Sequence, residues 1–247
     1  MTAPPALRKA GGIFVCVHPV MLSLPLRCLC VATALLATLL ARAGEIPPSV
    51  VWRLDDLASL GGAKTEIWGA PSRAKEGSGS SVRFDGKADG LVVPVIPISE
   101  WKAFTIEICF SVDADGQPEQ RFLHLQDEKG RRVLIELRLL PGGQWCLDTF
   151  LYSDAAHRLT LIDRAKAHQV GRWHWAALTY ADGRMTHFVD GVRECEGAIQ
   201  FEPMSATGRT SLGVRQNKVS WFKGAIREVR FTPEARPAEK LQRAPKD

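Results

Sequence analysis

The sequence predicts an all-β protein, a sandwich of two antiparallel sheets. Two Asp-Gly pairs, Asp182-Gly183 and Asp190-Gly191, separate apolar-rich segments in the last third of the chain. An Asp-Gly pair favours a two-residue type I′ turn, because both central residues of that turn adopt positive φ. The flanking segments alternate apolar and polar residues, which is the period of a half-buried strand. We therefore expect a meander of strands, without helices, over residues 173–180, 184–189 and 192–200.

The centre of the chain continues this pattern with four predicted strands, over residues 104–112, 120–126, 132–140 and 144–151. Glycine-containing turns separate the last three of them. Successive side chains of a strand point to opposite sides of its sheet, so residue number assigns the face. The odd-numbered positions of the last three strands are apolar and form the predicted core: Leu123, Leu125, Val133, Ile135, Leu137, Leu139, Trp145, Leu147 and Leu151.

The even-numbered positions of the same strands form a polar face with apolar islands, which is the candidate ligand-binding surface. The predicted register places Glu136 opposite Asp148, with Arg138 beside them. Carboxylates directly opposite each other are unfavourable unless something compensates their charges. The polar positions are Gln120, His124, Gln126, Glu136, Arg138, Gln144, Cys146 and Asp148, and the apolar ones are Phe122, Leu134 and Phe150.

Three roles are compatible with this face. In the first, Arg138 bridges both acids in a solvated network that binds no ligand. In the second, the acids and Arg138 hydrogen-bond to sugar hydroxyls while Phe122 or Phe150 stacks on a pyranose ring. In the third, Glu136 and Asp148 are the carboxyl pair of a retaining glycosidase, whose members stand roughly 5 to 5.5 Å apart.

Further candidate contacts lie near this face. His124 belongs to it, and the polar loop Arg215, Gln216 and Asn217 precedes an aromatic residue at the predicted rim of the sandwich, where binding residues are common. The chain has no Gly-x-Ser-x-Gly elbow of a serine hydrolase and no Cys/His spacing of a zinc site. No loop has the dense oxygen donors of a calcium site. We therefore expect neither a metal nor a cofactor.

The first 43 residues have the composition of a secretory signal peptide. They contain four basic and no acidic residues, and an apolar run over residues 28–41 leads to Ala41-Arg42-Ala43. Such a run followed by a small-x-small site predicts cleavage after Ala43, and hence a secreted or periplasmic protein. Met21 also begins a well-proportioned signal peptide and is a second possible start. The alternative is an uncleaved membrane anchor, although the run is shorter than the roughly 20 residues of a spanning helix.

Without the leader, the chain is nearly neutral. Residues 44–247 retain 28 Lys and Arg against 27 Asp and Glu, a net charge of +1, compared with +5 for the whole chain. The basic balance therefore belongs to the leader, and we expect no nucleic acid partner. A membrane partner is expected only through an uncleaved leader.

Residues 44–247 have the length of one all-β domain. The polar tail over residues 240–247 is expected to fray. Only Cys109, Cys146 and Cys195 remain after the leader, so at most one disulfide can form and one thiol is left over.

Short motifs of this segment occur in the order typical of a known family. They are F-D-G at 84–86, F-T-I-E at 104–107, W-H-x-x-A at 173–177, D-G at 190–191 and F-x-G-x-I-x-E-V-R at 222–230. On these motifs the chain resembles a LamG-like jelly-roll domain of the concanavalin A-like lectin/glucanase superfamily. The resemblance implies a jelly-roll sandwich of two antiparallel sheets. It also implies a general tendency to bind carbohydrates or surfaces, but this fold serves many activities.

The resemblance supplies no active site. The laminarinase-like glucanases of this fold have E-x-D-x-x-E on one strand, whereas here Glu136 is followed two residues later by Arg138. We therefore expect a secreted, non-catalytic binding protein for a glycan or another cell-envelope or extracellular component. One alternative is a glycoside hydrolase or lyase that uses Glu136 and Asp148. The other is a structural or protein-adhesion domain with no small ligand.

Overall fold

A computed structural model describes residues 48–76 and 79–244. The predicted signal peptide, residues 1–43, lies outside them. Within these ranges the chain forms strands and one short 3₁₀ turn, Ala238–Lys240, and contains no α-helix. The described residues include no helix that is long and apolar enough to cross a membrane.

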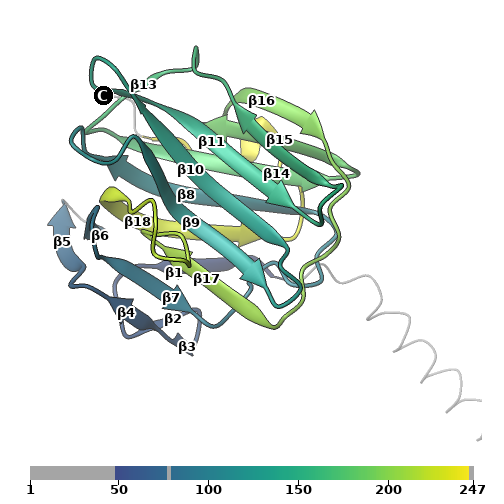
Figure 1. The fold of residues 1–247 in the computed structure, drawn as a ribbon, viewed down its shortest axis with the longest axis horizontal. Coiled ribbons are helices and arrows are strands. Elements are labelled where there is room, and N and C mark those ends of the chain that lie inside the picture. Colours follow the sequence, from purple (N-terminus) through teal and green to yellow (C-terminus); the bar gives the residue numbers. More distant parts are fainter. Residues whose placement is uncertain (1–47, 77–78, 245–247) are drawn as a thin grey trace, which may run out of the picture. The chain divides into compact units, whose positions relative to one another are not determined.

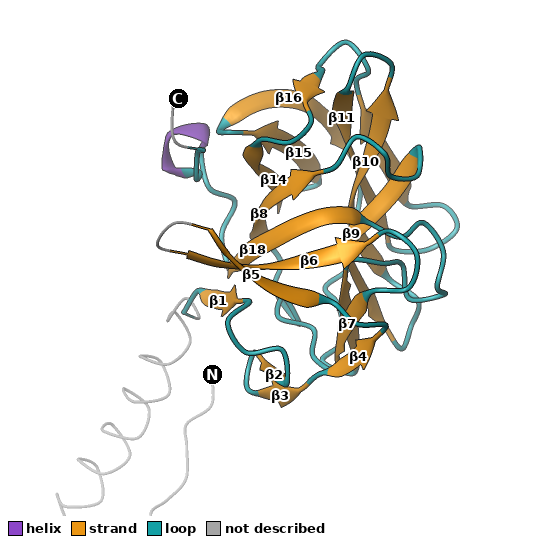
Figure 2. Cartoon of the chain, turned by 90° about the vertical axis from the view of Figure 1, so that its left-hand side faces the viewer, coloured by secondary structure: helices purple, strands orange, loops and turns teal. Residues whose placement is uncertain are grey.

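Two large antiparallel sheets pack face to face, as the sequence predicts (Figures 1 and 2). Sheet I has the order β16 (Val192–Ala198), β15 (Arg184–Val189), β14 (Trp173–Ala181), β8 (Phe104–Val112), β18 (Lys223–Thr232), β6 (Gly79–Asp85) and β5 (Ser72–Glu76), and β1 (Val50–Arg53) also pairs with β18. Sheet II has the order β12 (Arg158–Ile162), β11 (Gln144–Tyr152), β10 (Arg132–Leu140), β9 (Glu119–Asp127), β17 (Gly208–Leu212), β7 (Gly90–Val93) and β4 (Glu66–Trp68), and β13 (His168–Gln169) also pairs with β11. A small hairpin joins β2 (Ser59–Leu60) to β3 (Ala63–Lys64).

The chain crosses repeatedly between the two sheets, which is the jelly-roll topology. It leaves sheet I after β8, builds β9 to β12 in sheet II, returns for β14 to β16, and then contributes β17 to sheet II and β18 to sheet I. The predicted type I′ turns are confirmed, because Asp182, Gly183, Asp190 and Gly191 all have φ between 49° and 75°. The predicted strands are found within two residues at each end.

One apolar core fills the space between the sheets. At its centre the ring centroid of Phe110 lies 4.4 Å from that of Phe122 and 5.0 Å from that of Trp145. The predicted core positions of the three strands are confirmed, since all are buried except Leu139, which is half-buried and packs against the core.

The prediction that Phe122 lies on the polar face is wrong. A β-bulge in β9 is the reason, because Leu123 pairs with Ile135 while Arg121, not Phe122, pairs with Glu136. Because of the extra residue, the side chains of β9 that precede the bulge point to the face opposite to the one that residue number predicts. Phe122 is therefore fully buried in the core, and Arg121 takes the place beside Glu136.

The expected fraying of the tail is also wrong for residues 240–244. The Gln242 N–H donates a 2.7 Å hydrogen bond to Glu107 Oε1, and Leu241 is buried with Ala177 and Phe188. This segment covers Glu107 on the outer side of β8. All nine residues of that strand are buried, including those that alternation places on a polar face. Burial raises the pKa of Glu107. Residues 245–247 lie outside the described ranges.

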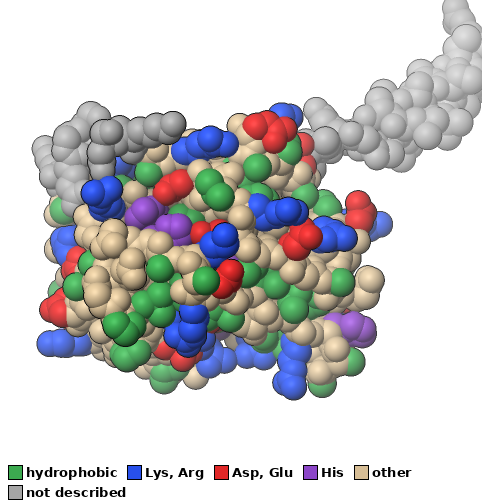
Figure 3. Space-filling view, turned by 90° about the horizontal axis from the view of Figure 1, so that it is seen from above, with side chains coloured by type: hydrophobic (Ala, Val, Ile, Leu, Met, Phe, Trp, Pro, Cys, Tyr) green, Lys and Arg blue, Asp and Glu red, His purple; other side chains and the backbone are tan. Residues whose placement is uncertain are grey.

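Charges of both signs are interspersed on the surface seen from above in Figure 3. The three cysteines Cys109, Cys146 and Cys195 are all free, so no disulfide forms among them. Burial raises the pKa of the Cys109 thiol to about 12.

The bulge can be tested by two phenylalanine truncations. Because Phe122 fills the core, Phe122→Ala should lower the free energy of unfolding by about 3 to 5 kcal/mol. The matched control is Phe150→Ala, an even-numbered position of the neighbouring strand that is only half-buried and should cost roughly 1 kcal/mol. Urea denaturation measures both, and equal losses would contradict the reversed alternation.

Candidate functional site

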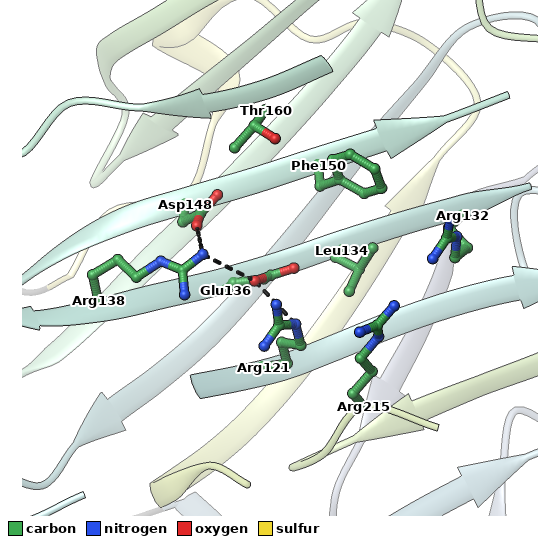
Figure 4. A pocket seen from close by; sticks show the side chains of 9 residues that line it. All are labelled: Arg121, Arg132, Leu134, Glu136, Arg138, Asp148, Phe150, Thr160 and Arg215. Atoms are coloured by element: carbon green, nitrogen blue, oxygen red, sulfur yellow. Dashed lines mark ion pairs between the residues drawn. The ribbon is translucent and has the colours of Figure 1, made fainter. Parts of the chain in front are cut away.

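A hollow of about 220 Å³ lies on the outer face of sheet II, where the polar face was predicted (Figure 4). We call it the arginine hollow. Strands β9 to β12 and the loop after β17 build it. Its lining residues are Arg121, Arg132, Leu134, Glu136, Arg138, Asp148, Phe150, Thr160 and Arg215.

The two acids at the centre of the hollow face each other across β10 and β11, as the sequence predicts. Glu136 pairs with Asp148 in the strand register. Arg138 compensates their charges, because its Nη2 lies 2.5 Å from Asp148 Oδ2 and 3.8 Å from Glu136 Oε2.

Arg121 is the second cation of this network. Its Nε lies 3.1 Å from Glu136 Oε2. Both Arg121 and Arg138 also form ion pairs with Glu119, at the start of β9. Glu119 and Glu136 thus bridge the two guanidinium groups, and Asp148 holds Arg138 in addition, which fixes their positions on the sheet.

The acids lie beneath the arginines. The side chains of Glu136 and Asp148 are 4% and 2% exposed, whereas those of Arg121 and Arg138 are 13% and 19% exposed. A ligand in the hollow therefore meets guanidinium N–H donors more readily than carboxylate oxygens. The floor includes the apolar side chains of Leu134, which is buried, and Phe150, which is half-buried.

Burial governs the protonation of the acids. It raises the pKa of Glu136 to about 7, against the opposing charge of Arg121, and the charge of Asp148 adds to the rise. Burial also raises the pKa of Asp148, although Arg138 opposes it. Glu119 behaves in the opposite way, because its hydrogen bond from Arg138 lowers its pKa to about 2.

A second hollow, of about 450 Å³, adjoins the first and shares Arg138, Asp148 and Thr160 with it. It adds Glu119 and Arg164 to the charged residues of the surface. Together the lining residues of the two hollows extend across strands β9 to β12.

The loop between β17 and β18 forms the rim of the arginine hollow and is anchored to β9. The Gly213 N–H donates to Phe122 O, and the Arg121 N–H donates to Ser220 O at 2.9 Å. Gly213 has φ of +81°, and a Cβ there would lie 2.2 Å from the Phe84 ring, so only glycine fits. Lys218 and Ser220 have positive φ without being glycine, and such strain is common at binding loops.

His124 supports this loop from below rather than lining the hollow. It is 1% exposed, and its Nδ1 accepts a 3.2 Å hydrogen bond from the Gln216 N–H. Burial lowers the pKa of His124 to about 3, and the positive charges of Arg215, Arg132 and Arg121 lower it further. The histidine is therefore neutral near pH 7, which lets it keep accepting this hydrogen bond.

The sequence-predicted site residues thus separate into three groups. Glu136, Arg138, Asp148 and Arg215 line the hollow, His124 and Gln216 hold the rim loop, and Asn217 is exposed and lines neither hollow. Sequence reasoning missed Arg121, Arg132 and Thr160. Arg132 has the even parity of the polar face and could have been found, whereas the bulge concealed Arg121. No group of three or more His, Cys, Asp or Glu within the described ranges could hold a metal ion.

The raised pKa of Glu136 gives a pH-dependent stability. The folded protein binds this proton more tightly than the unfolded chain, so the stability it contributes is lost as pH rises from about 4.5 to about 7. Over this window wild type should lose up to about 3 kcal/mol of unfolding free energy relative to Glu136→Gln. Urea denaturation across the pH range measures this difference.

Glu119→Gln is the matched control. The pKa of Glu119 is lowered to about 2, so its contribution is present above pH 4.5 and is lost as pH falls towards 2. Parallel curves for wild type and Glu136→Gln between pH 4.5 and 7 would show that burial does not raise the pKa of Glu136.

Solved structures with this fold include carbohydrate-binding domains. Domain 4 of AbnA, a GH43 extracellular arabinanase from Geobacillus stearothermophilus, in complex with arabinotriose, has a TM-score of 0.60 and 18% identity, over 79% of this chain and 97% of that chain. The botulinum neurotoxin serotype D ligand binding domain in complex with N-acetylneuraminic acid has a TM-score of 0.59 and 11% identity, over 77% of this chain. The match spans about half of that neurotoxin chain, 48%.

The family is shown by the sequence itself. The family profile Laminin_G_3, described as concanavalin A-like lectin/glucanases superfamily, matches residues 85–242. No curated protein matches the chain. The matched residues run from the last residue of β6 to Gln242 and so include most strands of both sheets. The chain therefore belongs to the concanavalin A-like lectin/glucanase superfamily, through its Laminin_G_3 family.

Proposed function

We propose that this protein is a secreted or periplasmic, non-catalytic binding protein that holds a glycan in the arginine hollow. The observation that supports this most directly is the hollow itself, in which fixed guanidinium groups surround an apolar floor on the outer face of sheet II. Binding sites for small ligands combine apolar lining with a few well-placed polar groups in this way. The signal peptide that the sequence predicts over residues 1–43 supports export.

Each part of the hollow has a role in sugar binding. The N–H donors of Arg121 and Arg138 hydrogen-bond to ring and hydroxyl oxygens of a sugar. Phe150 offers an aromatic side chain to the apolar face of the pyranose, a role that Phe122 cannot take because it is buried in the core. Glu136 and Asp148 keep the arginines in place before the ligand arrives, which reduces the entropy lost on binding.

The second candidate function is glycoside hydrolysis or lysis with Glu136 and Asp148. One observation favours it: the pKa of Glu136, raised to about 7, suits a general acid near neutral pH. The ion pairs of both acids favour the binding role instead, because Glu136 Oε2 and Asp148 Oδ2 already contact guanidinium groups. An enzyme would release reducing ends from a polysaccharide, and Glu136→Gln would abolish that release while leaving binding nearly unchanged.

Affinity electrophoresis through gels that contain plant, algal and bacterial polysaccharides tests the proposal. At least one polymer should retard the protein, and Phe150→Ala should weaken that retardation roughly tenfold. The matched control is Trp175→Ala on sheet I, because Trp175 is also a half-buried aromatic residue with an arginine over its ring. The distance from the guanidinium carbon to the ring centroid is 5.3 Å at Trp175 and 5.7 Å at Phe150. It should leave retardation unchanged.

Two outcomes would contradict the proposal. Retardation by no polymer would favour a structural or protein-adhesion role. Equal losses in Phe150→Ala and Trp175→Ala would show that the glycan binds elsewhere on the protein.

A further inference from the structure

The surface formed by the two hollows has more positive than negative groups. Five guanidinium groups, those of Arg121, Arg132, Arg138, Arg164 and Arg215, face only three carboxyl groups, those of Glu119, Glu136 and Asp148. All three carboxyl groups form their ion pairs with Arg121 and Arg138. The remaining arginines, Arg132, Arg164 and Arg215, therefore form no ion pair with these carboxyl groups.

Arg132 is held in place without an anionic partner. Its guanidinium carbon lies 4.4 Å from the ring centroid of Tyr152 and 5.7 Å from that of Phe150. Cation–π contacts of this kind fix the guanidinium and leave its N–H donors free at the edges. Among the described residues no carboxylate lies within ion-pair distance of Arg132.

Arg215 also lines the arginine hollow, and among the described residues no carboxylate lies within ion-pair distance of it. Its backbone is fixed by the hydrogen bond from the Lys218 N–H, and the next residue is held by His124. Burial lowers the pKa of Arg215, and repulsion by Arg121 and Arg132 lowers it further. Partly buried cations that repel one another are stabilised when an anion binds between them.

The two groups share one end of the hollow. Figure 4 shows the guanidinium nitrogens of Arg132 and Arg215 on the same side of the site, at the end away from Arg138 and Asp148. Leu134 and Phe150 lie between them and the acids. A sugar ring over this apolar floor would direct a substituent towards both arginines.

Building on the proposed function, we propose that the arginine hollow selects a glycan that bears an anionic group, a carboxylate or a sulfate ester, and that Arg132 and Arg215 bind this group. Planar guanidinium groups bind such oxyanions with paired, charge-assisted hydrogen bonds. A neutral sugar would leave the two cations uncompensated, so it should bind more weakly.

Matched polysaccharides that differ only in charge test the inference. Polygalacturonate is compared with its methyl ester, and chondroitin sulfate with desulfated chondroitin and with its carboxyl-reduced form. Affinity electrophoresis of the whole protein should show polygalacturonate binding at least about tenfold tighter than its neutral methyl ester, or chondroitin sulfate binding at least about tenfold tighter than the derivative that lacks the preferred anionic group. The affinity should fall as NaCl rises from about 50 to about 300 mM. The two series separate a carboxylate from a sulfate as the preferred group.

Charge-removing variants locate the effect. Arg132→Gln and Arg215→Gln should each weaken binding of the anionic polymer about fivefold or more and leave weak binding of the neutral one unchanged. The matched control is Arg193→Gln, which removes the same charge. Arg193 is an exposed arginine of sheet I that pairs with Glu196. Circular dichroism checks that each variant is folded.

Three results would overturn the inference. Equal binding of neutral and charged polymers, with no effect of either variant, would remove anion selectivity and leave glycan binding standing. An equal loss in Arg193→Gln would show general electrostatic attraction instead of a site. No binding of any polymer would contradict the inference and the proposed function together.

Discussion

One extra residue in β9 determines how the outer face of sheet II is built. The bulge opposite Ile135 and Glu136 directs Phe122 into the core, where it stacks on Phe110 at 4.4 Å, and brings Arg121 to the outside. Without it, a phenylalanine would stand beside Glu136, and this buried acid would keep only the more distant contact with Arg138, at 3.8 Å. A buried carboxylate that lacks a cation costs several kcal/mol. The bulge thus makes the acidic pair of the hollow tolerable.

The same bulge positions the rim of the hollow. It leaves the carbonyl of Phe122 and the N–H of Arg121 free of β10, and the loop between β17 and β18 bonds to both, through Gly213 and Ser220. That loop carries Arg215 over the sheet, while the neutral His124 holds Gln216 beside it. Core packing, acid compensation and the approach of Arg215 therefore depend on one local irregularity, which explains how a strained loop keeps a defined geometry.

The sequence predicts the fold far better than the site. Alternating apolar residues and the Asp-Gly turns depend on local rules, and the register that places Glu136 opposite Asp148 follows from a short turn between β10 and β11. Arg121 could not be predicted, because a bulge has no clear sequence signal here and shifts every residue before it by one face. Burial of β8 on both sides also escaped prediction, since it depends on contacts such as that of Gln242 with Glu107, 135 residues apart.

The arginine side chains offer the most direct test of the account. We would record the Nε–Hε resonances of the arginines by nuclear magnetic resonance while adding a short oligogalacturonate. Shifts at Arg132, Arg215 and Arg138 that saturate together, with Arg193 unchanged, are the result that we expect. Shifts confined to arginines of sheet I, or no shift at the hollow while the ligand is demonstrably bound, would contradict the assignment of the arginine hollow as the binding site.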